Sequence, residues 1–248
     1  MTQRPGLLDG KSVLVTAAAG TGIGFATAKR CAEEGARVVI SDIHERRLRE
    51  SAEQLGGVHA VLANVTSEDD VQHLVAETIE VCGGIDVLVN NAGLGGTAHL
   101  TEMTDEQWHK VLDVTLTGTM RMTRATLRHM CKRGTGAIVN NSSVVAWRAQ
   151  EGQAHYAAAK AGVLALTRCA AIEAAPHNVR VNAVAPSLAM HPNLAKVTTE
   201  ELLGELTTRE AFGRAAEPSE VANVIVFLAS DLASYMTGEV VSVSSQHP

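Results

Sequence analysis

Short apolar runs rich in β-branched residues alternate with longer segments of helical periodicity along most of the chain. Most of these runs are apolar throughout, as expected for strands whose sheet is covered by helices on both faces. Strands that alternate with helices of about 10–20 residues predict βαβ units and a doubly wound parallel sheet. The seven runs are Ser12–Thr16, Arg37–Ser41, Val58–Ala63, Ile85–Asn90, Gly136–Asn141, Val179–Ala185 and Val240–Val243.

Helical segments separate these runs, and no internal repeat or Pro-rich linker divides the 248 residues. The pairs Thr104 with Gln107 and Ser67 with Asp70 resemble capping boxes at two helix starts. We therefore expect an α/β fold with a single Rossmann-like domain over residues 1–248. The expected helices lie near 23–34, 44–55, 67–82, 104–131, 154–175 and 219–229.

A polar segment from Ser187 to Gly213 interrupts the alternation between the sixth and seventh strands. A long insertion at the carboxyl end of a strand is a usual place for a loop that covers a ligand. We expect a substrate lid near 187–213, and an ordinary pair of surface helices is the alternative.

Composition excludes several classes of protein. The net charge of −6 and the aromatic content of 3% argue against nucleic-acid binding. No apolar run is long enough to span a membrane, and the four cysteines lie too far apart for a zinc ribbon or a disulfide framework. We expect a cytoplasmic protein with no membrane contact, no nucleic-acid partner and no metal.

A glycine-rich turn, Thr16 to Gly24, joins the first strand to the first helix. Glycines let the backbone approach a pyrophosphate, whose charge is met by free N–H groups at a helix N-terminus. A simple strand-to-helix turn is the alternative, but the position after a buried strand favours phosphate binding. The cofactor-binding candidates here are Gly20, Thr21, Gly22 and Ile23.

An acidic residue, Asp42, ends the second strand 18 residues after Gly24. Its carboxylate can accept hydrogen bonds from adenosine ribose hydroxyls and would repel the extra phosphate of NADP. The alternative is a surface Asp that caps the following helix, and Arg46 and Arg47 nearby weaken the discrimination. The sequence favours NAD over NADP.

Tyr156 and Lys160 are four residues apart in an expected helix, which places both side chains on one face. A neighbouring ammonium stabilises a phenolate, so we expect Lys160 to lower the pKa of Tyr156. Tyr156 then exchanges a proton with an alcohol or a carbonyl while hydride moves to or from nicotinamide. Ser143, at the end of the fifth strand, is expected to hydrogen-bond the substrate oxygen.

The chain as a whole resembles the short-chain dehydrogenase/reductase family. The residues that carry the resemblance are the glycine turn, Asp42, Asn90-Asn91-Ala92-Gly93, Ser143 and Tyr156-Ala157-Ala158-Ala159-Lys160. The resemblance implies a seven-stranded sheet and a nicotinamide cofactor. It assigns Tyr156 as acid/base, Lys160 as ribose ligand and pKa modulator, and Ser143 as the group that polarises the substrate oxygen.

Further cofactor contacts are implied by the same resemblance. They are Asn64 and Val65 beside the adenine, Asn91, Ala92 and Gly93 along the cofactor cleft, and Pro186 and Leu188 facing the nicotinamide carboxamide.

The sequence departs from the usual family pattern at four places. Ala17 replaces the first glycine of the phosphate turn, which also has one extra residue. Thr115 stands where an Asn usually holds a proton-relay water, so we treat it as a weakened relay member. Ser187 replaces a glycine, and Ser244-Ser245-Gln246 replaces D-G-G.

The chain looks closest to 3-oxoacyl reductase-like members, and stretches such as Trp147-Arg148-Ala149-Gln150 resemble actinobacterial members that act on CoA thioesters in steroid-ring breakdown. Trp147 offers a flat wall for a substrate, or packs under its loop. Arg148, Arg209 and Arg214 are candidates to meet the phosphates of a CoA thioester, or are ordinary surface arginines.

The resulting expectation is an NAD(H)-dependent oxidoreductase that interconverts a secondary alcohol and a ketone. The alternatives are an NADPH-dependent 3-oxoacyl-thioester reductase and a non-catalytic dinucleotide sensor, which the Thr115 substitution favours. Ten alanines in Ala154–Ala175 allow another helix to approach closely, so we expect a homodimer or homotetramer.

Overall fold

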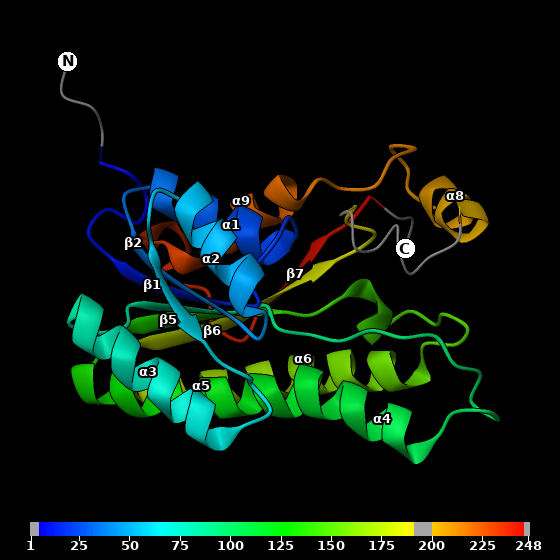
Figure 1. The fold of residues 1–248 in the computed structure, drawn as a ribbon, viewed down its shortest axis with the longest axis horizontal. Helices are drawn as coiled ribbons and strands as arrows, with labels where there is room; N and C mark the ends of the chain where they lie inside the picture. Colours follow the sequence, from blue (N-terminus) through cyan, green and yellow to red (C-terminus); the bar gives the residue numbers. More distant parts are fainter. Residues whose placement is uncertain (1–4, 191–199, 246–248) are drawn as a thin grey trace.

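The fold is a three-layer α/β sandwich, shown in Figure 1 as a computed structural model that describes residues 5–190 and 200–245. All seven expected strands form one parallel sheet in the order β3-β2-β1-β4-β5-β6-β7. The sequence prediction of the sheet is therefore confirmed. The strands are β1 (Ser12–Thr16), β2 (Arg37–Asp42), β3 (His59–Leu62), β4 (Val87–Asn90), β5 (Gly136–Asn141), β6 (Val179–Pro186) and β7 (Val240–Val243).

Helices cover both faces of this sheet (Figure 1). One face carries α1 (Ile23–Glu33), α2 (Glu45–Gln54) and α9 (Pro218–Ala229). The other face carries α3 (Glu68–Cys82), α4 (Asp105–Leu112), α5 (Gly118–Arg133) and α6 (Ala154–Ala174).

Each strand contributes to two apolar cores because successive side chains point to opposite faces. In β1, Val13 and Val15 join the core under α1 and α9, whereas Leu14 joins the core under α3 and α5. This two-sided burial explains why the strands read as continuous apolar runs.

The expected single helix 104–131 is wrong in detail. The chain forms α4, then a π-helical turn at Asp113–Thr117, and then α5, which ends at Arg133. Three β-branched residues, Val114, Thr115 and Thr117, lower the α-helical propensity of this turn. Such π-turns inside helices often occur at functional sites.

The capping residues Ser67 and Thr104 behave as expected, each accepting a hydrogen bond from a backbone N–H three residues later.

Of the expected lid, the structure describes residues 187–190 and 200–213, and these contain helix α8 (Glu200–Thr208). Residues 191–199 lie outside the described part, so the lid over the whole of 187–213 stays a prediction. None of the described helices is long and apolar enough to cross a membrane.

Candidate active site at the carboxyl ends of the strands

The glycine turn takes a path that exposes the start of α1. Gly20 has a φ of +100°, and a Cβ added at Gly20 or Gly22 would meet no atom within 4 Å. Helix α1 begins at Ile23, and its first turn has no acidic residue and no side-chain cap from the described part of the chain. The first N–H groups of a helix have no partner within it. These donors beside open glycines fit the pyrophosphate of a dinucleotide.

Ala17 stands where the family pattern has glycine, and the structure shows the consequence. Its φ is +50°, in the left-handed region that favours glycine. Its carbonyl lies close to α1, because a Cβ added at Gly24 would come within 2.4 Å of Ala17 O. The turn therefore keeps the glycine-like conformation, and a glycine is required at position 24.

Asp42 ends β2 beside the same turn. One carboxylate oxygen accepts a hydrogen bond from Ala19 N at 3.2 Å and the other from His44 N at 3.0 Å. Burial raises the pKa of Asp42, and backbone donors together with Arg47 oppose the rise. Asp42 therefore braces the glycine turn and the start of α2, and its contact with an adenosine ribose stays a prediction.

A side-chain network joins the ends of β1, β4 and β5. Asn91 Nδ2 donates to Ala17 O at 2.9 Å, and Asn141 Nδ2 donates to Asn91 Oδ1 at 2.9 Å. Thr16 Oγ1 accepts from the backbone N–H groups of Asn91 and Ala92 at 3.0 and 3.2 Å. Asn91 therefore ties the end of β4 to the turn after β1 and to the end of β5, and its contact with a cofactor stays a prediction.

Tyr156, Lys160 and Ser143 come together above this network. Lys160 Nζ lies 5.5 Å from the centre of the Tyr156 ring and donates a hydrogen bond to Asn141 O at 2.6 Å. The side chains of Ser143 and Tyr156 are joined by a hydrogen bond. Gly93 lies beside the ammonium, since a Cβ added there would be 3.4 Å from Lys160 Nζ.

The expected direction of the Tyr156 pKa is wrong. Burial raises the pKa of Tyr156 to about 12, which outweighs the lowering by the Ser143 hydrogen bond. Burial also lowers the pKa of Lys160 to about 8. Desolvation disfavours the charged form of each group, and the Lys160 ammonium is held by a backbone carbonyl. A protonated Tyr156 at neutral pH is suited to donate a proton.

Thr115 is buried in the π-helical turn, near Gly93. Its hydroxyl accepts from Leu94 N at 3.0 Å and donates to Leu94 O at 3.2 Å. Both hydrogen bonds fix the loop after β4, so the structure shows Thr115 as a support of that loop. Its part in a proton relay stays a prediction.

The remaining predicted cofactor residues also lie at the carboxyl ends of their strands. Asn64 is exposed, and its side chain accepts from Thr66 N at 3.0 Å, whereas Val65 is buried against the position of Gly118. Pro186 O accepts a hydrogen bond of 3.5 Å from Ser143 Oγ, and Leu188 follows two residues later.

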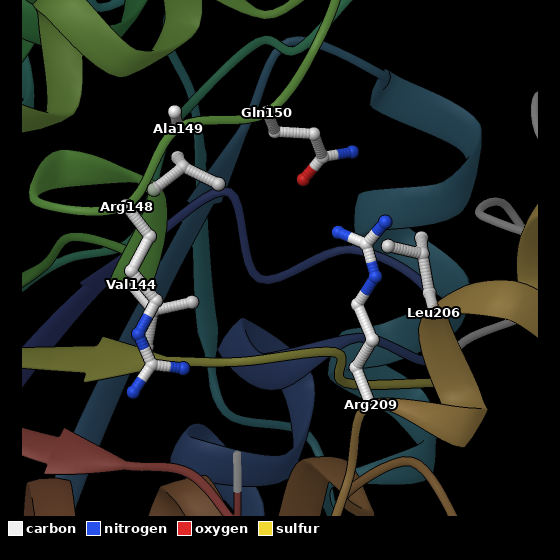
Figure 2. Close-up of a pocket in the computed structure, with 7 residues that line it drawn as sticks. Val144, Arg148, Ala149, Gln150, Leu206 and Arg209 are labelled. Carbon is white, nitrogen blue, oxygen red and sulfur yellow. The ribbon is translucent and has the colours of Figure 1, made fainter. Parts of the chain in front are cut away.

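A cavity of about 370 Å³ is lined by residues that follow Ser143 in the chain and by residues of the α8 region (Figure 2). Its walls come from the segment after β5 and from the end of the α8 region. In Figure 2 the Arg209 side chain extends toward Gln150, and Arg148 runs along the opposite wall. The lining residues are Val144, Val145, Arg148, Ala149, Gln150, Leu206 and Arg209.

The structure separates the substrate candidates by the cavity lining. Arg148 and Arg209 line this cavity and Arg214 does not, whereas Arg209 and Arg214 each pair with a glutamate, Glu205 and Glu220 respectively. Trp147 is not among the residues that line this cavity, so it does not form its wall. It is also 47% exposed, so it is not packed under its loop.

Two residues with a part in the site were not singled out from the sequence. Asn141 holds Lys160 through its carbonyl, and the pattern Asn140-Asn141-Ser142-Ser143 at a strand end was the available signal. Glu210 is 4% exposed, and one Glu among several in a polar segment gives no sequence signal of burial.

The family profile described as Enoyl-(Acyl carrier protein) reductase matches residues 17–245. The chain is 60% identical over 250 residues to a Mycobacterium tuberculosis protein named (5R,7aS)-5-hydroxy-7a-methyl-1-oxo-2,3,5,6,7,7a-hexahydro-1H-indene-carboxyl-CoA reductase, covering 98% of this chain and 95% of that protein. It is 42% identical to a 3-oxoacyl-(acyl-carrier-protein) reductase of Thermotoga maritima, covering 95% of this chain and 97% of that protein.

A solved structure of a short chain dehydrogenase from Mycobacterium smegmatis matches with a TM-score of 0.87 and 58% identity. The match covers 98% of this chain and 95% of that one.

Proposed function

The chain belongs to the short-chain dehydrogenase/reductase family of NAD(P)-dependent oxidoreductases, and on that premise we propose that it interconverts a ketone and a secondary alcohol on a CoA thioester, with NAD(H) as cofactor. The observation that carries the proposal is the meeting of Tyr156, Ser143 and Lys160 at the same edge of the sheet as the open start of α1. The Mycobacterium tuberculosis relative, which is a carboxyl-CoA reductase by name, supports the substrate class.

The residues of the chain fit a dinucleotide. The open glycines and the first N–H groups of α1 would hold its pyrophosphate, and Asp42 would accept hydrogen bonds from the adenosine ribose. When bound, the nicotinamide supplies or accepts the hydride. The position of Asp42 supports NAD because a carboxylate repels the 2′-phosphate of NADP.

The chemistry left to the protein is proton transfer. In reduction, Tyr156 Oη donates its proton to the substrate carbonyl oxygen, which the Ser143 hydroxyl also hydrogen-bonds. Lys160, held by Asn141 O, stabilises the phenolate that forms. In oxidation the same groups act in reverse, and the phenolate takes the alcohol proton.

The test is a screen of hydride transfer at 340 nm. Acetoacetyl-CoA and 3-hydroxybutyryl-CoA serve as thioesters and trans-1-decalone as a bicyclic ketone without CoA, each with NAD(H) and NADP(H). We expect turnover of a thioester with preference for NAD(H). Preference for NADPH would instead indicate a 3-oxoacyl-thioester reductase linked to NADP. Cofactor binding without turnover of any substrate would indicate a sensor.

The Asp42→Ser variant tests the cofactor preference separately. Removing the carboxylate removes the repulsion of the 2′-phosphate, so the ratio of NADPH to NADH efficiency rises. Equal ratios in the variant and the wild type would exclude Asp42 as the determinant.

We also propose a cytoplasmic homodimer or homotetramer. Helix α6 presents an exposed apolar stripe of Ala158, Ala165, Cys169 and Ile172, on which a second copy can pack. Size-exclusion chromatography with light scattering tests this, and a species of one chain mass would exclude it.

A further inference from the structure

Glu210 is a buried carboxylate outside the catalytic group. It lies two residues after α8, at the end of the segment that supplies Leu206 and Arg209 to the cavity wall, and it is 4% exposed. Acidic side chains are rarely buried unless hydrogen bonds satisfy their oxygens. The partners of Glu210 therefore indicate what the residue holds in place.

Two of those partners come from other segments of the chain. Glu210 Oε2 accepts a hydrogen bond from Ser245 Oγ at 2.8 Å, and Glu210 Oε1 accepts one of 3.4 Å from Leu188 N. Next to it, Ala211 N donates to Ser245 O at 2.7 Å. One carboxylate thus links the segment after β6, the segment after α8 and the segment after β7.

Backbone hydrogen bonds reinforce the same junction. Ala216 N donates to Leu188 O at 2.8 Å, and Met190 N donates to Ala216 O at 3.0 Å. Residues 188–190 and 210–216 are therefore fastened together at one point, beside the end of β7. The position of α8 and of the cavity wall it carries depends on that point.

The same contact accounts for a departure from the family pattern. Ser245 replaces a residue of the usual D-G-G sequence, and its hydroxyl is the group that reaches Glu210. A glycine at this position has no side chain to donate this hydrogen bond.

We propose that Glu210, together with Ser245, is a positioning residue that sets substrate selectivity: it fixes Leu206 and Arg209 across the cavity from Arg148 and Gln150. The selectivity is for ketones that carry an extended thioester arm over ketones without one. This inference rests on the proposed function, because it takes this cavity as the place that receives the substrate.

The test compares wild type with Glu210→Ala, Glu210→Gln and Ser245→Ala in NADH-dependent reduction of acetoacetyl-CoA and trans-1-decalone. For Glu210→Ala we expect KM for acetoacetyl-CoA to rise about tenfold while kcat stays within about twofold. The kcat/KM for trans-1-decalone stays close to the wild-type value. Ser245→Ala should also raise KM for acetoacetyl-CoA without changing kcat, but by a smaller factor. Glu210→Gln can still accept and donate hydrogen bonds, so it should keep the wild-type KM.

A purely structural role would lower kcat for both substrates in proportion, and that result would overturn the proposal. Amide hydrogen exchange over residues 203–216 gives a readout independent of turnover. Exchange should be faster in Glu210→Ala than in wild type or Glu210→Gln, and unchanged exchange would overturn the proposal. If wild type reduces neither substrate, the proposed function fails, and the exchange result alone decides whether Glu210 positions this segment.

Discussion

Two regions meet at the carboxyl edge of the sheet, and they are held in different ways. At the ends of β1, β4 and β5, side-chain amides bond directly to neighbouring strands, as Asn91 does to Ala17 O and Asn141 to Asn91. Around the cavity, the α8 segment is held by the Glu210 junction, while Arg209 and Arg214 pair with glutamates near their own positions in the chain.

In the proposed function, the first region holds the cofactor and the proton donor, and the second forms a wall of the substrate cavity. The cofactor and the proton donor require fixed geometry, which buried hydrogen-bond networks provide. The cavity wall on α8 is held by the Glu210 junction and by exposed ion pairs, and exposed ion pairs contribute little to stability. Substitutions in the first region should therefore affect chemistry or folding, and those in the second should affect substrate affinity.

The largest effect is expected at Tyr156. The Tyr156→Phe variant lacks the hydroxyl that donates the proton, so kcat for ketone reduction should fall by about 10²–10⁴-fold. NADH binding, followed by fluorescence titration, should be retained because the phenol oxygen is the only group removed. A rate close to wild type would exclude Tyr156 as the proton donor.

In the glycine turn, an added methyl group at position 24 should lower the stability of the protein clearly, whereas removal of one at position 17 should change it little. Gly24→Ala should lower the free energy of unfolding by about 2 kcal/mol, because its Cβ would lie 2.4 Å from Ala17 O. Ala17→Gly should remain within about 1 kcal/mol of wild type, since relief of its left-handed conformation offsets the greater entropy of glycine in the unfolded chain. Urea denaturation measures both, and equal losses would contradict the geometry of the turn.

Lys160 should make stability depend on alkaline pH. Its pKa is about 8 in the folded protein against an ordinary 10.5, so between these values the unfolded chain binds a proton that the folded chain has released. The free energy of unfolding of wild type should therefore rise relative to Lys160→Met as pH increases from 7.5 to 9.5, by about 2 kcal/mol. A difference that does not change with pH would contradict the buried ammonium.

The smallest effect is expected at the cavity arginines. Arg209→Met should raise KM for acetoacetyl-CoA by about threefold, the size expected for one exposed charge, and leave kcat unchanged. Arg214→Met is the matched control, because Arg214 is bound to Glu220 and does not line the cavity. Equal effects of the two substitutions would show that net charge, and not the cavity, is responsible.

Sequence patterns were sufficient for the sheet and for the shared face of Tyr156 and Lys160, because side-chain periodicity is a local property of the chain. They failed for the π-helical turn at Asp113–Thr117, which periodicity does not separate from an α-helix. They also failed for the direction of the Tyr156 pKa, since the spacing that brings an ammonium near a phenol says nothing of how deeply both are buried.

The sequence of strands and helices along the chain, the glycine turn, the carboxylate at the end of β2 and the shared face of Tyr156 and Lys160 on α6 could all be predicted from the residues alone. Three features emerged only when the segments were placed in space: which arginines face the cavity, that Asn141 holds Lys160, and that Glu210 meets Leu188 and Ser245. The features that could be predicted differ from the others in how far apart along the chain the interacting residues lie. Contacts between residues a few positions apart follow from backbone geometry, whereas those between segments tens of residues apart depend on how the whole sheet and its loops pack.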